Sequence, residues 1–287
     1  MARIPLGIET DNPGSYQTKL NNREKKLAEA IREDANIEDT FQQAFTVGHT
    51  NQVDGTVYTG AAAERLGFNT GSNPFELYVS GVVNGAAVVG PWQDASGLNF
   101  TSSAGGTGPD DWEIGHGTTS QSKAAYTVGS FGGNKRAFFE CTVDVADISD
   151  VTEMWMGWRK AEAYQADPDN YDEMASFNVG EDADGQIELH TILNGGATGN
   201  VDTTETDWAD GAAYKLRIEV ENNGKCHFFI SAADTTHAGA AALDANTPTV
   251  TTAFSFDDGE VILPFLRFHT EAGDPVATVN NWKVGYK

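Results

Sequence analysis

The pattern of apolar and polar residues is clearest in the segment AYKLRIEVENNGKCHFFI, residues 213–230. Apolar side chains occupy every second position on both sides of a turn, at Tyr214, Leu216, Ile218 and Val220 and then at Cys226, Phe228 and Ile230. A period of two predicts strands with one buried face. The intervening Glu221-Asn222-Asn223-Gly224 supplies residues that tolerate positive φ, so we predict an antiparallel hairpin.

Similar short runs recur through the second half of the chain and are rich in β-branched and aromatic residues. They cover residues 137–148, 151–159, 171–180, 185–193, 261–270 and 276–287, each bounded by Gly, Asn, Asp or Pro. No helical period lies between them, so a parallel α/β sheet with crossover helices is excluded. The pattern predicts an all-β fold, an antiparallel β-sandwich or barrel over residues 135–287.

The first half of the chain is less regular. Residues 46–134 are rich in Gly and Thr, with short alternations that predict strands joined by long loops, either as a separate region or as one domain with the rest (46–287). Residues 1–20 are polar and predict an extended arm. Between Asn21 and Phe45, apolar residues fall mostly four positions apart, which predicts one or two amphipathic helices.

Charge separates the N-terminal segment from the body. The chain of 287 residues carries 18 Lys and Arg against 42 Asp and Glu, a net charge of −24 that argues against a general nucleic-acid-binding surface. Residues 1–32 carry a net charge of +2 and the remaining 255 carry −26. We expect residues 1–45 to dock on a partner; the alternative is a helix with solvated lysines. The expected docking residues are Arg3, Ile4, Leu6, Ile8, Arg23, Lys25 and Lys26.

Targeting and redox signals are weak. The start MARIPLGIETDNPG has no apolar core of a signal peptide, so we expect synthesis in a cytoplasm. Cys141 and Cys226 both fall in predicted strands, where two buried thiols are expected and a disulfide is the alternative.

Three segments carry a resemblance to a known family: MASFNVGEDADGQIELHTILNGG (174–196), TDWADGAAYKLRIEVENNGKCHFFISA (206–232) and the terminal NNWKVGYK. Residues 135–287 resemble the concanavalin A-like lectin/glucanase jelly roll in its laminin-G or pentraxin-like form. With its arm and helix ahead of an acidic β body, the whole chain resembles virion structural proteins of tailed bacteriophages. That resemblance implies a capsid decoration or cement protein, present in many copies on a shell, whose partners are the major capsid protein or other virion subunits.

Glucanases of this family carry a Glu-x-Asp-x-x-Glu strand, whose carboxylates supply the nucleophile and the acid/base. The nearest match is Glu205, Asp207 and Asp210, which ends in Asp and lies in the loop TTETDWADG. The sequence also lacks G-x-S-x-G, H-E-x-x-H and G-x-x-x-x-G-K-[ST] patterns, and its six histidines are scattered. We therefore predict no enzymatic activity and no catalytic residues.

Acidic residues suggest one candidate metal site. Asp167, Asp169 and Asp172 share a turn-prone loop, and Glu181, Asp182 and Asp184 follow in the next one. Such oxygen ligands suit Ca²⁺, which lectin-like jelly rolls often hold in rim loops, although Asp also occurs in loops because it forms turns. No other cofactor is expected.

Aromatic residues give the candidate glycan contacts. Exposed rings can stack on a sugar, with Trp92, Trp112, Trp158 and Tyr164 as candidates and core packing as the alternative. Trp155 and Trp158 are three positions apart and should face opposite sides of a strand. Two functions follow as hypotheses: a non-enzymatic virion decoration protein, or a carbohydrate-binding lectin-like module.

Overall fold

The computed structural model describes the chain from Ile37 to Lys287 with gaps. The described residues are 37–39, 59–68, 75–82, 89–93, 98–101, 110–116, 124–132, 134–180, 185–203, 207–233, 250–270 and 276–287. Ile37–Lys287 form one unit, and Met1–Asn36, which lie outside the described residues, are assigned to another. Among the described residues, no helix is long and apolar enough to cross a membrane.

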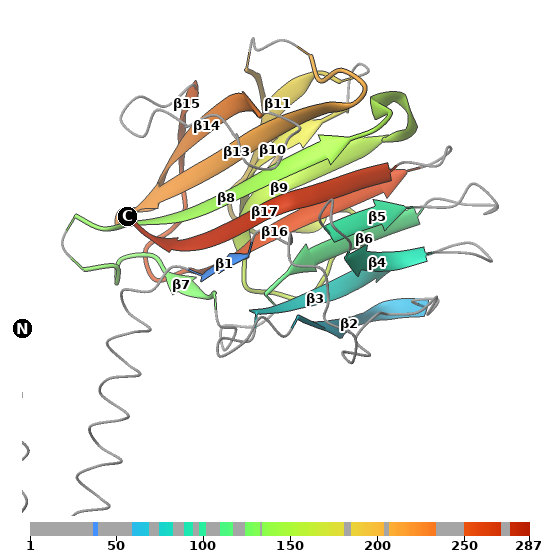
Figure 1. The fold of residues 1–287 in the computed structure, drawn as a ribbon. Coiled ribbons are helices and arrows are strands. Elements are labelled where there is room, and N and C mark those ends of the chain that lie inside the picture. Colours follow the sequence, from blue (N-terminus) through green and yellow to red (C-terminus); the bar gives the residue numbers. More distant parts are fainter. Residues whose placement is uncertain are drawn as a thin grey trace, which may run out of the picture. The chain divides into compact units, whose positions relative to one another are not determined.

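Strands make up nearly all of the regular structure, and they pair into two antiparallel sheets (Figure 1). Sheet A runs in the order β15-β14-β13-β8-β17-β5-β4, with β1 also paired to β17. Its strands are β1 (Ile37–Asp39), β4 (Val89–Gln93), β5 (Leu98–Thr101), β8 (Arg136–Val145), β13 (Ala212–Glu221), β14 (Lys225–Ala233), β15 (Val250–Ser255) and β17 (Val276–Tyr286).

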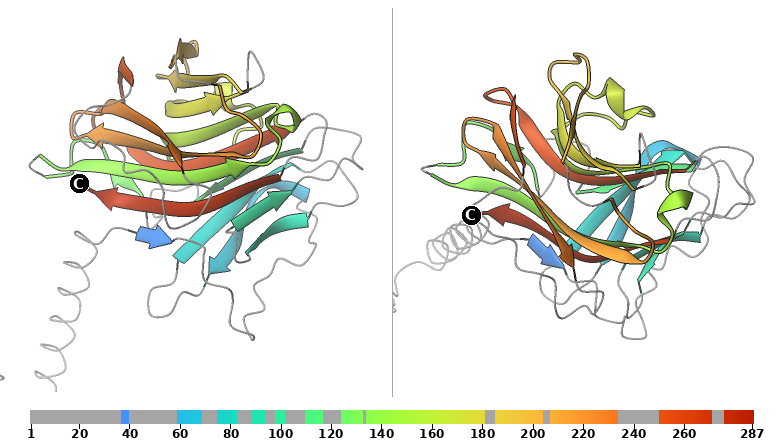
Figure 2. Two further views of the ribbon diagram at one scale, coloured as in Figure 1. Left: turned by 45° about the horizontal axis from the view of Figure 1, so that its top comes forward. Right: turned by 90° about the horizontal axis from the view of Figure 1, so that it is seen from above.

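Sheet B runs in the order β12-β11-β10-β9-β16-β6-β3-β2, with β7 also paired to β16. Its strands are β2 (Thr59–Phe68), β3 (Phe75–Val82), β6 (Asp110–Gly115), β7 (Tyr126–Thr127), β9 (Glu153–Lys160), β10 (Met174–Val179), β11 (Ile187–Ile192), β12 (Gly199–Asp202) and β16 (Val261–Thr270). Figure 2 shows the sheets as two facing layers, which confirms the antiparallel β-sandwich.

The core lies between the sheets and is built from alternate residues of their central strands. Phe139 on β8 packs against Trp282 on β17 with ring centroids 4.5 Å apart. Trp158 on β9 crosses from sheet B, where its indole N–H donates to the carbonyl O of Ile218 on β13 at 3.2 Å. All four side chains are fully buried, so this packing joins the two layers through apolar burial.

The predicted hairpin is confirmed. β13 and β14 pair in the register Leu216↔Ile230 and Ile218↔Phe228. Within their turn only Gly224 has positive φ, at +83°, so the two asparagines are not needed for that conformation. A Cβ at Gly224 would overlap the carbonyl O of Phe256 in the neighbouring turn. Glycine is therefore required here by both conformation and space.

Strand β1 corrects part of the helix prediction for residues 21–45. Ile37 pairs with Val284 and Asp39 with Trp282 on β17. On the same edge of β17, β5 pairs only with Val276–Val279, so the edge beyond it is available for β1. Ladder hydrogen bonds with β17 outweigh the local helical period at these three residues. The rest of the predicted helix lies outside the described residues.

Strands from residues 46–134 and from 135–287 share both sheets. β6 pairs with β16 in sheet B, and β5 pairs with β17 in sheet A. The boundary at residue 134 therefore separates strands that lie side by side in each sheet.

Cys141 and Cys226 are both buried and unbonded, which agrees with the expectation of two buried thiols.

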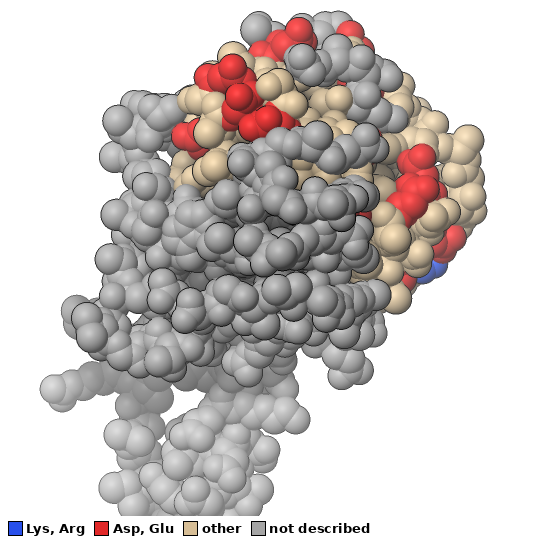
Figure 3. Space-filling model, turned by 90° about the vertical axis from the view of Figure 1, so that its right-hand side faces the viewer, with Lys and Arg blue, Asp and Glu red and all other residues tan. Residues whose placement is uncertain are grey.

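Loops at one end of the sandwich are acidic. Figure 3 shows the side of the molecule that lies on the right in Figure 1, where Asp and Glu side chains gather on the upper part and at one edge. The loops after β8 and before β13 expose Asp147, Asp207 and Asp210. The described part of this end agrees with a solvated acidic surface.

Candidate functional site

A row of polar side chains crosses the outer face of sheet B. Residues directly opposite in the strand register point to the same side of a sheet. Trp155 lies on the outer face because its neighbours Met154 and Met156 belong to the core between the sheets. The register then aligns, from β12 to β6, Asp202, Glu188, Asn178, Trp155, Arg267 and Glu113. We call these six residues the polar row.

Part of the polar row lies beneath residues 161–173, between β9 and β10, which we call the covering segment. Arg267 on β16 forms an ion pair with Asp111 on β6, with Nε donating to Oδ1 at 2.8 Å. Its Nη1 donates to the carbonyl O of Gln165 at 2.7 Å. The hydroxyl of Tyr164 donates to the same Asp111 carboxylate at 2.8 Å. This first clamp therefore ties the covering segment to the sheet.

A second clamp repeats the arrangement beside the first. Arg159 on β9 donates from Nε to Glu113 Oε1 at 3.0 Å and from Nη1 to the carbonyl O of Glu162 at 3.1 Å. Tyr171 donates to Glu113 Oε2 at 2.6 Å. Burial, and after it the Glu113 charge, raises the pKa of Tyr171, so its hydroxyl remains a donor. Both arginines are about 1% exposed, and this half of the face is closed by the two clamps.

Towards β12, His190 on β11 lies between Trp155 and Asp169. The indole N–H of Trp155 donates to His190 Nδ1 at 2.9 Å. Because an indole N–H can only donate, Nδ1 accepts and the imidazole proton sits on Nε2. Nε2 lies 3.2 Å from Oδ1 of Asp169, on the 3₁₀ turn η2 (Pro168–Asn170) of the covering segment. Thr198 donates to that same Asp169 oxygen at 2.8 Å.

The polar row opens to solvent at the edge strand β12. Asn200 and Asp202 are exposed there, and the side chain of Asp169 is 56% exposed. Glu188 and His190 lie buried directly behind them. We define the open half as Asp169, Asn178, Glu188, His190, Asn200 and Asp202. It combines carboxylates, amides and an imidazole, and these six residues include no Lys or Arg.

Two of the predicted glycan contacts are buried elsewhere. Trp158 is wrong as a surface contact, because it faces the core and its N–H is taken by Ile218. Tyr164 is 8% exposed and belongs to the first clamp, with the Arg267 guanidinium 5.0 Å from its ring centre. The opposite orientation of Trp155 and Trp158 is confirmed. The side chains of Trp92 and Trp112 lie outside the described residues.

The three predicted calcium ligands each have another partner. Asp167 accepts from the backbone N–H of Asp169 at 3.0 Å, and Asp169 faces His190. Asp172 is paired with the Lys160 ammonium at 2.6 Å. Within the part of the chain that the structure describes, no group of three or more His, Cys, Asp or Glu residues is placed to hold a metal ion. Glu181, Asp182 and Asp184 lie outside that part.

The remaining predicted residues fall on loops or beyond the described ranges. Asp207 is exposed, and Asp210 accepts from the backbone N–H of Ile148 at 3.0 Å, which gives it a structural partner. Glu205 lies outside the described residues. The docking residues from Arg3 to Lys26 also lie outside them, so their role remains a prediction.

The sequence contained a signal for the open half that the motif search did not use. In IELHTI the outward positions carry Glu188 and His190, and in MASFNV they carry Ser176 and Asn178. Polar residues at every second position of two buried strands indicate a built polar face. The contact with Asp169 depends on the covering segment and has no signature in the spacing.

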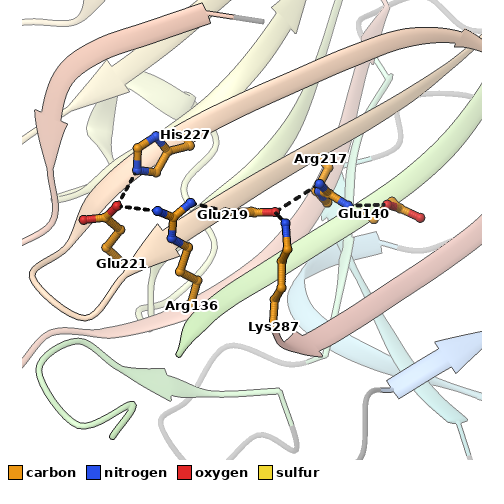
Figure 4. A network of polar contacts seen from close by, with 7 residues as sticks. All are labelled: Arg136, Glu140, Arg217, Glu219, Glu221, His227 and Lys287. Atoms are coloured by element: carbon orange, nitrogen blue, oxygen red, sulfur yellow. Dashed lines mark hydrogen bonds and ion pairs between the residues drawn. The ribbon is translucent and has the colours of Figure 1, made fainter. Parts of the chain in front are cut away.

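A second polar cluster lies on the outer face of sheet A (Figure 4). At its centre, the fully buried carboxylate of Glu219 contacts Arg136 at 3.2 Å, Arg217 at 3.0 Å and Lys287 at 3.0 Å. Glu221 contacts both Arg136 and His227. Positive and negative groups alternate across β8, β13, β14 and the end of β17. Removing one partner would leave another charge buried without it, so we assign this cluster a structural role in the sheet.

Comparison with known proteins gives no match to a family model and none to a curated protein. Among solved structures, the carbohydrate recognition domain of Emp47p is 11% identical, with 76% of this chain and 91% of that chain covered and a TM-score of 0.46. Peanut lectin is 8% identical, with 88% and 97% covered and a TM-score of 0.46. A pseudo-β-1,3-glucanase of Mycobacterium tuberculosis is 12% identical, with 87% and 97% covered and a TM-score of 0.44. With values this low, function has to be argued from the side chains of this chain.

Proposed function

We propose that this chain is a carbohydrate-binding protein that holds a neutral glycan at the open half of sheet B. The observation that supports the proposal is the set of donors and acceptors gathered there. A sugar hydroxyl both donates and accepts, and it is matched by carboxylates that accept and by amides that do both. Hydrogen bonds to the ionised oxygens are the stronger ones.

Charge selects among glycans. Asp169, Glu188 and Asp202 converge on the open half, whose six residues include no Lys or Arg. An anionic sugar such as a uronate would meet like charge and lose affinity. Neutral oligosaccharides are therefore the proposed ligands, without a required metal.

Glycan-array binding followed by calorimetry tests this proposal. Neutral oligosaccharides should bind and uronate-containing ones should not. Glu188→Gln and Asn200→Ala should each weaken binding about tenfold, since one hydrogen bond to a charged or polar group contributes roughly 1 to 3 kcal/mol. Asn223→Ala, in the exposed turn of the hairpin, is the matched control. Equal binding by the control and by both site variants would refute this location, and a preference for acidic glycans would refute the ligand class.

We also propose that the bound glycan is not cleaved. Asp210 holds the backbone at Ile148, and Asp207 stands on an exposed loop. Replacing Glu205, Asp207 and Asp210 together with Gln or Asn should leave a panel of β-glucans intact, as with the unchanged protein. Turnover that disappears on Glu205→Gln alone would overturn this proposal.

Attachment to a bacteriophage shell is the second candidate function. It is favoured by the charge contrast between residues 1–32, at +2, and the remainder, at −26. Residues 1–20 have few apolar groups to offset an ordering cost of roughly 1 to 2 kcal/mol each, so contact with a partner would have to order them. A chain lacking residues 1–20 should melt as the full chain does but fail to join the assembly. Incorporation at full occupancy would move docking to the β-sandwich.

A further inference from the structure

Carboxylates gather where the covering segment meets the turn between β15 and β16. Lys160, at the end of β9, contacts Asp172 at 2.6 Å and Glu260 at 2.9 Å. Glu173 and Asp257 lie in the same contact region, because the backbone N–H of Asp257 donates to Glu173 Oε2 at 3.1 Å. Four acidic residues therefore gather in this region, and the one ammonium there, of Lys160, contacts two of them.

Glu173 differs from the other carboxylates in its burial. It is fully buried, whereas the side chains of Asp172 and Glu260 are 41% and 27% exposed. Its Oε1 atom has no hydrogen-bond partner among the described residues. An ionised oxygen in that position would be both desolvated and unpaired, which costs more than burying a neutral carboxyl group. The site is therefore better suited to the protonated acid.

We propose that Glu173 is a proton-binding site that fastens the covering segment to turn 256–260 when it is protonated and loosens that contact when it ionises. This inference goes beyond glycan binding and stands without it. Protonated Glu173 keeps its contact with the Asp257 N–H and adds no charge. Ionised Glu173 adds a fourth negative charge beside Asp257 and Glu260, and the shared Lys160 cannot neutralise it.

Burial and the surrounding charges place this change near neutral pH. Burial, followed by the carboxylates of Glu260 and Asp257, raises the pKa of Glu173 to about 7. The Asp257 N–H and the Lys160 ammonium oppose that shift. Of the nearby groups, the Glu162 carboxylate is engaged by the Asp172 N–H at 2.9 Å, and Asn194 donates to the other side of Asp257 at 3.0 Å. The acidic groups near Glu173 therefore outnumber the single base, Lys160.

Loosening of the covering segment would affect the open half, because the same segment carries Asp169. Asp169 is four residues before Glu173 on the covering segment and lies 3.2 Å from His190. If the proposed function is right, glycan affinity should fall as Glu173 ionises. The proton-binding proposal is tested without ligand, so its failure and the failure of glycan binding are separate results.

Hydrogen exchange of the full chain, followed from mildly acidic to mildly alkaline pH, tests the proposal. After correction for intrinsic exchange, residues 162–173 and 256–260 should exchange faster above a midpoint near the pKa of about 7. Glu173→Gln mimics the protonated acid and should remove this transition. Glu260→Gln removes a charge that raises the pKa and should move the midpoint to lower pH. Asp147→Asn, on an exposed loop, should change nothing.

Two results would overturn the proposal. One is a transition of unchanged midpoint and size in Glu173→Gln, which would assign the titration to another group. The other is exchange in these segments that shows no transition in the unchanged protein. A midpoint that Glu260→Gln leaves in place would remove the proposed electrostatic cause.

Discussion

The indole N–H of Trp155 donates to Nδ1 of His190 at 2.9 Å, and this contact fixes the imidazole tautomer. A doubly protonated ring would set two N–H groups against each other, so the contact favours neutral His190 with its proton on Nε2. Nε2 lies 3.2 Å from Oδ1 of Asp169. A buried tryptophan thus orients the histidine ring that the exposed carboxylate of Asp169 contacts.

Trp155→Phe keeps an apolar ring at this position but removes the N–H that fixes the His190 tautomer. Removing the indole donor leaves Nδ1 with only the longer contact from Asn178 Nδ2, at 3.4 Å, which should cost about 1 to 3 kcal/mol of unfolding free energy. The ¹⁵N shifts of the His190 ring should move towards a tautomer mixture. Trp282→Phe is the matched control, since Trp282 donates to His116 Nε2 at 2.8 Å and its loss should alter His116 alone. An unchanged His190 ring in Trp155→Phe would show that Trp155 does not fix the tautomer and would leave that role to Asn178.

The two clamps predict strong coupling between residues far apart in sequence. Arg267→Met alone, or Asp111→Leu alone, leaves one buried charge unpaired and should cost about 3 to 5 kcal/mol. The double variant should cost clearly less than the sum of the single ones, as urea unfolding of all four proteins would show. Glu221→Gln, at a partly exposed pair with Arg136, should cost no more than about 1 kcal/mol. Additive costs at Arg267 and Asp111 would mean that the clamp is not a coupled unit.

Much of the fold was predictable because strand alternation is a local signal. The hairpin of β13 and β14 joins residues close in sequence, and its buried positions Leu216, Ile218 and Val220 were identified from the pattern alone. Which of Trp155 and Trp158 faces the core depends on how the sheets stack, and the alternation does not encode that choice. The strand β1 was equally unpredictable from local alternation, because it forms by pairing with the free edge of β17.

The candidate site was harder to predict because its contacts are long-range. Asp111 and Arg267 are separated by 156 positions, and each looks like an ordinary charged residue in its own strand. Glu219 likewise alternates with apolar neighbours as a solvated position would, yet it is buried among three basic side chains. Only the strand order brings such partners together. Composition therefore indicated the polar residues but not which of them meet.

Alanine substitutions at two glycines in neighbouring turns distinguish the cost of backbone strain from the cost of steric overlap. Gly224 and Gly259 both have positive φ, at +83° and +88°, so alanine at either should cost roughly 1 kcal/mol for the left-handed conformation. Only at Gly224 would the added Cβ overlap the Phe256 carbonyl, whereas nothing lies within 4 Å at Gly259. Gly224→Ala should therefore lower the melting temperature distinctly more than Gly259→Ala. Equal shifts would show that the turn relaxes around the new methyl group.

Stability should fall as pH rises through the acidic range, and Glu173 should be one cause. Its pKa is about 7 in the folded chain against an ordinary value of 4.5, so the native state holds this proton after the unfolded chain has lost it. The stabilising contribution is complete below pH 4.5 and is lost as pH approaches 7.

Glu173→Gln should flatten that part of the profile and be more stable than the unchanged protein above the window. The net charge of −24 adds a second decline through surface repulsion, and salt should reduce that part far more than the buried contribution. Unfolding free energies measured across this pH window at low and high salt separate the two. If high salt abolishes the difference between Glu173→Gln and the unchanged protein, the decline belongs to the surface and Glu173 has no part in it.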